Sequence, residues 1–148
     1  MDAQSRERIA IRSRDEIARI REACRLVHEI LRELAEAAVP GTSTAELDRL
    51  AEARARARGA EPAFLGYHGY PASLCISVND EVVHGIPSPR RVLREGDIVG
   101  LDFGVVLGGW YGDSAVTVPV GRVSPEAARL LEVTAGALAA AVDAARPD

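Results

Sequence analysis

The amino-acid sequence predicts an α+β fold in which an antiparallel sheet carries helices on one face. Three observations predict it: two capped amphipathic segments come first, Gly- and Val-rich strand-like segments occupy residues 63–121, and another helical segment follows. The chain has 148 residues, of which 47% are hydrophobic and 27% charged. This length and composition are typical of one globular domain with a sizeable core.

Residues 14–38 form the clearest predicted helix. Apolar side chains recur there at spacings of three and four and line one face: Ile17, Ile20, Cys24, Val27, Leu31 and Leu34. The pattern S-x-x-E at residues 13–16, repeated at 43–46, is a capping box, in which each side chain bonds a free backbone N–H of a helix start. The second capping box begins a helix that we expect to reach about Arg58.

The remaining predicted elements are strands and one more helix. Residues 74–79 have the composition of a strand. The segments 97–107 and 110–120 are strand-like and are separated by Gly108–Gly109, which predicts a hairpin with a two-residue turn. A Ser-Pro pair then predicts a last helix over roughly residues 125–145.

Charge and hydropathy exclude several classes of protein. The formal net charge of −4 argues against a nucleic-acid partner, because nucleic-acid-binding domains usually carry a basic face. No apolar run reaches the roughly 18 residues that a membrane span needs, so we expect no membrane partner. Residues 1–16 lack the apolar core of a secretory signal, which favours a cytoplasmic location. Cys24 and Cys75 belong to no CxxC or zinc spacing, and we expect both to be buried hydrophobic residues.

The hairpin brings two carboxylates together. With Gly108–Gly109 as the turn, Gly104 pairs with Asp113, and Asp102 lies two positions from Gly104 on the same face. Their Cα atoms are then about 7–8 Å apart, as diagonal neighbours. Two like charges on a mostly apolar sheet repel, and a divalent cation between them would remove the repulsion. Turn chemistry, with one carboxylate facing water, is the alternative.

Three histidines and one further aspartate complete the candidates. His84 ends the run SVNDEVVHGIP, where we expect a strand to meet a turn, and a histidine there is well placed to reach a substrate. His68 lies in a Gly- and Tyr-rich loop, where a turn role and a functional role are equally consistent with the sequence. We expect His28 to be structural and Asp97 to be a turn residue.

Long motifs in this chain resemble type I methionine aminopeptidase. They are PGTSTAELD, LGYHGYPASLCISVNDEVVHGIP and REGDIVGLDFGVVLGGWYGDSAVTVPVG, and together with the two helices they cover nearly the whole chain. The resemblance implies the first half of the family's pita-bread fold. It also implies removal of the initiator methionine from nascent peptides, with two divalent metal ions (Co, Mn, Fe or Zn) that activate water.

The resemblance assigns a role to each matching residue. Asp102 matches the family's bidentate metal ligand, and Asp113 matches the aspartate that bridges both metals. His84 matches the catalytic histidine near the scissile amide. The substrate-binding positions are Phe64, Tyr67, Tyr70 and His84, where the aromatic residues contact the methionine side chain.

The family's remaining metal ligands have no match in this sequence. They are a histidine and two glutamates, and they lie, with a glutamate that shuttles protons, in the family's second half. We therefore expect residues 1–148 to be the amino-terminal portion of one catalytic domain and to be inactive alone. The alternatives are a non-catalytic binding or assembly protein, or one chain of a split enzyme completed by a second-half chain or a second copy. An uncovered apolar sheet also predicts self-association.

Overall fold

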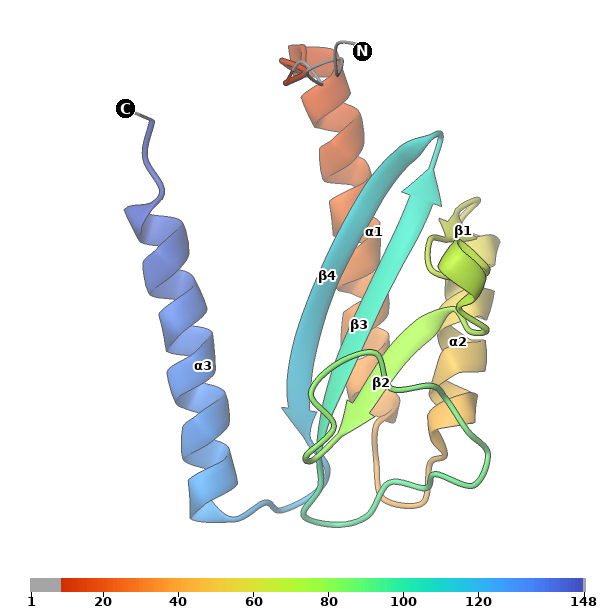
Figure 1. Cartoon of the computed structure of the whole chain (residues 1–148), viewed down its shortest axis with the longest axis vertical. Coiled ribbons are helices and arrows are strands. Elements are labelled where there is room, and N and C mark those ends of the chain that lie inside the picture. Colours follow the sequence, from red (N-terminus) through yellow and green to blue (C-terminus); the bar gives the residue numbers. More distant parts are fainter. Residues whose placement is uncertain (1–8, 148) are drawn as a thin grey trace, which may run out of the picture.

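A four-stranded antiparallel sheet with two helices on one face is the centre of the structure, a computed structural model that describes residues 9–147 (Figure 1). The elements in chain order are α1 (Arg14–Ala37), α2 (Thr44–Ala57), β1 (Glu61–Pro62), the 3-10 turn η1 (Tyr67–Gly69), β2 (Leu74–Val78), β3 (Ile98–Leu107), β4 (Trp110–Pro119) and α3 (Pro125–Ala144). The predicted fold class and the longer predicted elements are confirmed, with ends that agree within one or two residues.

Strand β3 is the middle of the sheet. It pairs with β4 along one edge and with β1 and β2 along the other. The β3–β4 hairpin closes at Leu107 and Trp110, as predicted. Gly108 and Gly109 have φ values of 56° and 82°, a conformation in which a residue with a side chain would be strained.

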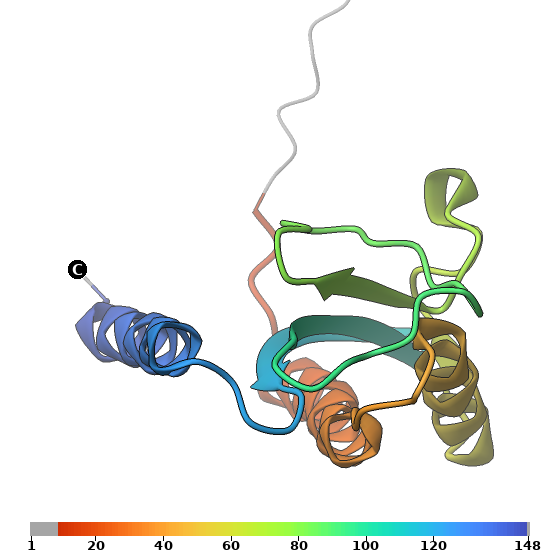
Figure 2. The ribbon, with the colours of Figure 1, turned by 90° about the horizontal axis from the view of Figure 1, so that it is seen from below.

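The core lies between the sheet and the helices α1 and α2, which cover the same face (Figure 2). Both capping boxes are formed, so each of these helices begins at the predicted residue. Alternate residues of β3 point into the core and are completely buried: Val99, Leu101, Phe103 and Val105. Because of this alternation, the side chains between them point to the opposite face of the sheet.

Helix α1 presents only part of the expected face to the sheet: Val27, Leu31 and Leu34 are buried as predicted. Cys24 is exposed and Ile17 is 45% exposed, whereas Ala23 is fully buried. The cause is Gly112 of β4: a Cβ atom placed there would lie 2.5 Å from the backbone carbonyl of Ala23. This close approach of backbones turns Ala23 towards the sheet and Cys24 away from it. The expectation that Cys24 is buried was wrong, and that for Cys75 is confirmed.

Helix α3 lies beyond the β4 edge and covers neither face of the sheet (Figures 1 and 2). Ser124 caps it as predicted, accepting a hydrogen bond from the N–H of Ala127 at 3.1 Å. Large apolar side chains of α3 are exposed: Leu130, Val133, Leu138 and Val142. Across residues 9–147, no helix is long and apolar enough to cross a membrane.

Candidate functional site

The two predicted carboxylates lie on the sheet face that α1 and α2 leave free. Gly104 of β3 pairs with Asp113 of β4, and Asp102 pairs with Ala115, so the two aspartates are diagonal neighbours as predicted. On the other side of β3, Cys75 of β2 pairs with Asp102. Because side chains alternate along a strand, Cys75, Asp102 and Asp113 all point to the same face.

A cavity of about 580 Å³ opens on this face. All six residues to which the resemblance assigned a role line it, although they come from four separate segments of the chain. The lining residues are Phe64, Tyr67, His68, Gly69, Tyr70, Pro71, Cys75, His84, Ile86, Asp102 and Asp113. The site therefore combines two carboxylates and two imidazoles with an aromatic wall, which is formed by Phe64, Tyr67 and Tyr70.

The electrostatics of the carboxylate pair suit a cation. Burial raises the pKa of Asp102, the negative charge of Asp113 raises it further, and His84 opposes both effects. A divalent cation would relieve the repulsion and replace the lost hydration. Carboxylate oxygens with a nearby imidazole are ligands that Mn, Fe, Co and Zn accept. Within residues 9–147, no group of three or more His, Cys, Asp or Glu side chains is arranged to hold a metal ion.

His84 reaches the cavity from a loop, and the expectation that it ends a strand was wrong. Strand β2 ends at Val78, whose N–H donates to the Glu81 carboxylate at 2.7 Å, and the chain turns at Asn79 with φ 59°. The chain then runs back beside β2, where the N–H of Ile76 donates to the carbonyl of Gly85 at 2.9 Å. His84 itself has φ 59°, a strained conformation for a residue with a side chain.

The aromatic wall depends on close contacts that glycine permits. Phe64 covers Gly104 so closely that a Cβ atom there would lie 2.8 Å from the ring. The turn η1 then places Tyr67 edge-on to His68, with ring centroids 4.3 Å apart. His68, for which the sequence left two roles open, therefore lies in the cavity wall.

Cys75 is a part of the site that the sequence pattern did not predict. We expected only a buried hydrophobic residue, yet Cys75 lines the cavity beside the carboxylates, and burial raises the pKa of its thiol. The pairing of β2 with β3 was the missing information, since it places Cys75 opposite Asp102. His28 is exposed on α1 and outside the cavity lining, and Asp97 is a turn residue whose carboxylate accepts the N–H of Arg94 at 2.8 Å.

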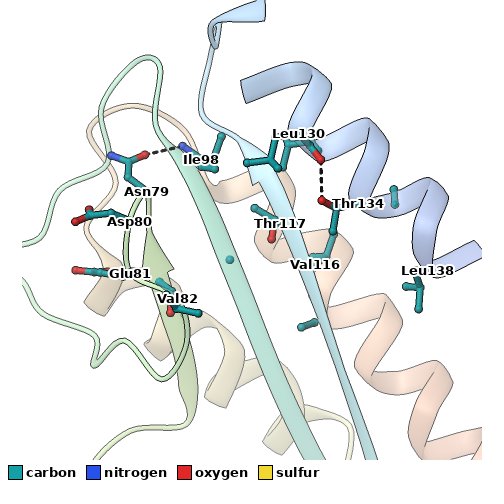
Figure 3. Close-up of a pocket in the computed structure, with 15 residues that line it drawn as sticks. Asn79, Asp80, Glu81, Val82, Ile98, Val116, Thr117, Leu130, Thr134 and Leu138 are labelled. Carbon is teal, nitrogen blue, oxygen red and sulfur yellow. Dashed lines mark hydrogen bonds between the residues drawn. The ribbon is translucent and has the colours of Figure 1, made fainter. Parts of the chain in front are cut away.

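A second groove, of about 770 Å³, separates α3 from the sheet (Figure 3). Leu130, Thr134 and Leu138 of α3 line one side. The opposite side includes Asn79, whose amide oxygen accepts the N–H of Ile98 at 3.0 Å, and the exposed Val82. The groove lies at the other end of the sheet from the aromatic wall, and most of its lining from α3 is apolar.

Sequence comparison places this chain among metallopeptidases. The model of metallopeptidase family M24 matches residues 18–148. The chain is 49% identical over 145 residues to methionine aminopeptidase of Aquifex aeolicus, covering 94% of this chain and 56% of the relative. It is 50% identical over 133 residues to methionine aminopeptidase 1 of Mycobacterium tuberculosis, covering 90% and 50%. The chain therefore spans about half the length of these curated relatives.

Solved structures agree with this result. The structure of methionine aminopeptidase from Thermotoga maritima matches with a TM-score of 0.91 and 38% identity, covering 95% of this chain and 56% of that one. Prolidase from Pyrococcus horikoshii matches with a TM-score of 0.80 and 26% identity, covering 93% and 38%. The fold is the first half of the pita-bread fold. On the extent of the family match and the identity to its relatives, the chain belongs to metallopeptidase family M24.

Proposed function

We propose that residues 1–148 are the amino-terminal portion of a methionine aminopeptidase domain, which removes the initiator methionine from nascent peptides in the cytoplasm. One observation carries the proposal: two carboxylates, His84 and three aromatic residues, drawn from separate segments, line one cavity. The names of the relatives support the substrate class.

Asp102 and Asp113 are the residues that would hold the metal. Divalent ions there would act as Lewis acids towards a peptide carbonyl and would lower the pKa of water. The carboxylate pair is suited to two ions, of which Co, Mn, Fe and Zn are the candidates. Asp102 is the more buried of the two, so its charge depends more strongly on a bound cation.

The other lining residues would bind and orient the substrate. Phe64, Tyr67 and Tyr70 form an apolar wall that suits an unbranched thioether side chain, and sulfur–aromatic contacts add about 0.3–1.5 kcal/mol each. His84 lies on the same cavity and would donate a hydrogen bond to the substrate amide next to the carboxylates.

The remaining metal ligands belong, in this proposal, to a second-half polypeptide. The chain spans about half of its relatives. The histidine and two glutamates that the resemblance implies would then lie in the other half. The non-catalytic alternative, an assembly protein with this half-fold, is favoured by one observation: the apolar side chains of α3 are exposed beside an open groove. The two functions differ in whether metal and a second-half chain produce turnover.

Methionine release from a Met-Ala-Ser peptide, with added Mn²⁺ or Co²⁺, tests the proposal. The chain alone is expected to show no turnover, and addition of a second-half polypeptide made from the Aquifex aeolicus relative is expected to produce it. Asp102→Asn should lower that turnover by about 100-fold or more, because the site loses a metal ligand and loss of an outer-shell partner alone costs about 10–100-fold. Asp15→Asn is the matched control: it makes the same charge change on the exposed start of α1 and should leave turnover unchanged.

Binding of Mn²⁺ by the chain alone is the second readout. Calorimetry is expected to give weak binding that Asp113→Asn removes. Equal binding by the parent chain and this variant would refute the metal site. Metal binding without turnover in the reconstituted mixture would instead favour the assembly protein.

A further inference from the structure

The hydroxyl group of Tyr70 joins two segments of the site. It lies 3.1 Å from the carbonyl oxygen of Leu74, at the start of β2, and 3.0 Å from the carbonyl oxygen of Gly85. One phenol proton is therefore shared between β2 and the residue that follows His84. The ring of Tyr70 lines the cavity at the same time, so the ring and the hydroxyl have separate contacts.

The segment that carries His84 depends on hydrogen bonds for its position. Val82 and Val83 are 90% and 63% exposed, so packing of these side chains contributes little. His84 has φ 59°, and a non-glycine residue keeps such a conformation only where its surroundings hold it. Those surroundings are the hydrogen bonds of the next residue, Gly85.

Gly85 is held from three directions. Its carbonyl accepts the N–H of Ile76 at 2.9 Å and the Tyr70 hydroxyl, and its own N–H donates to Oγ of Ser77 at 3.2 Å. A Cβ atom at this position would lie 1.9 Å from the carbonyl oxygen of Ile76, which shows how closely the loop approaches β2. Tyr70 is the only one of these partners that reaches Gly85 from outside β2.

The phenol is a dependable donor. Burial raises the pKa of Tyr70 above its ordinary value, and the neighbouring Cys75 raises it further. The hydroxyl group of Tyr70 therefore keeps its proton throughout the neutral range. Leu74, one of the two acceptors of this hydroxyl, is held in place by Asp48, whose carboxylate accepts the N–H groups of Ser73 and Leu74 at 2.9 Å each.

We infer that the Tyr70 hydroxyl is a positioning group that fixes the loop at Gly85 against β2 and thereby holds His84 over the Asp102–Asp113 pair. This inference rests on the proposed function for the catalytic role of His84. The contacts of Tyr70 do not depend on that role. The hydroxyl thus acts through His84, and the ring contributes separately to the aromatic wall.

The test is Tyr70→Phe, which removes the hydroxyl and keeps the ring. Loss of one hydrogen bond should speed amide exchange at Gly85 and Ile76 about five- to tenfold. The NMR signals of the His84 ring should shift or broaden, because the loop then samples more than one arrangement. Amides of the buried β3 residues, such as Val105, should exchange as in the parent chain. Tyr67→Phe is the matched control, since Tyr67 is 66% exposed in the same wall, and it should change none of these signals.

Two results would overturn the inference: unchanged Gly85 exchange and His84 signals in Tyr70→Phe, or faster exchange spread evenly over the whole sheet. Incorporation of 3-fluorotyrosine in place of Tyr70 provides a second arm that keeps both ring and hydroxyl. Its more acidic phenol donates a stronger hydrogen bond, so exchange at Gly85 should become slower, and no slowing would contradict the assignment. Neither arm measures metal binding or turnover, so failure here is distinguishable from failure of the proposed function.

Discussion

Replacing Gly112 with alanine should destabilise the chain through a clash between backbone atoms. A Cβ atom at this position would lie 2.5 Å from the carbonyl carbon and oxygen of Ala23 and 2.7 Å from the nitrogen of Cys24. Rotation of a side chain cannot relieve contacts with backbone, so α1 must move away from β4. A shift of about 0.9 Å is needed to reach ordinary van der Waals contact at 3.4 Å.

Such a shift loosens the packing of α1 over the sheet. Overpacking of this kind costs about 1–3 kcal/mol, and the reduced freedom of the unfolded chain returns roughly 0.4–1 kcal/mol. Because the contacts at Gly112 are with backbone atoms, the cost of overpacking should lie near the upper end of its range, and we expect Gly112→Ala to lower the free energy of unfolding by about 2 kcal/mol. With a urea m-value of about 2 kcal/mol/M, the midpoint of urea unfolding should fall by about 1 M.

The matched control makes the same substitution where the space is open. Among the described residues, no atom other than those of its chain neighbours and the adjacent helix backbone lies within 4 Å of a Cβ atom built on Gly136 of α3. Gly136→Ala should therefore not lower the urea midpoint, and it should increase the helical signal in circular dichroism, because alanine favours helix by about 0.8–1 kcal/mol. A Gly112→Ala midpoint equal to that of the parent chain would refute the proposed close packing of α1 on β4.

Two further predictions concern pH and association. Hydrogen bonds from Arg58 and Arg54 lower the pKa of Glu33, so its stabilisation is present above the unfolded pKa of about 4.5 and is lost as pH falls through the folded value. Glu33→Gln should lower the free energy of unfolding by about 0.5–1 kcal/mol at neutral pH and by less in acid. An equal loss of stability at neutral and at acidic pH would contradict the ion pair. The chain should self-associate through α3, as measured by sedimentation velocity. Leu138→Glu should reduce this association, whereas Ala140→Glu, which lies outside the groove lining, should not. A monomeric parent chain would contradict the prediction.

The helix ends and the hairpin followed from the sequence because their causes are local. A capping box satisfies backbone groups within four residues, and both boxes fixed the first residue of their helices. Gly108–Gly109 likewise fixed the register of β3 with β4, and this register alone placed Asp102 and Asp113 on one face. These parts of the fold and site therefore needed no knowledge of distant segments.

Other parts depended on contacts between distant residues. The position of His84 results from the return of its loop along β2, and that of Cys75 from pairing of β2 with β3. The exposed side of α1 was set by Gly112, nearly ninety residues away, which admits the backbone of Ala23. Periodicity within α1 shows that it has an apolar face, but it leaves the rotation of the helix uncertain by one position.

By itself the sequence determined the elements, their caps, the hairpin register and the motifs that resemble a metallopeptidase. Only the tertiary structure decided that the loop of His84, the turn of Tyr67 and the strand of Cys75 meet around the carboxylates, and that α3 leaves an apolar surface exposed. The physical reason is the sequence separation of the interacting residues. Hydrogen bonds within a turn or a helix end are specified by neighbouring residues. The meeting of separate segments is specified by packing and strand pairing across the whole chain.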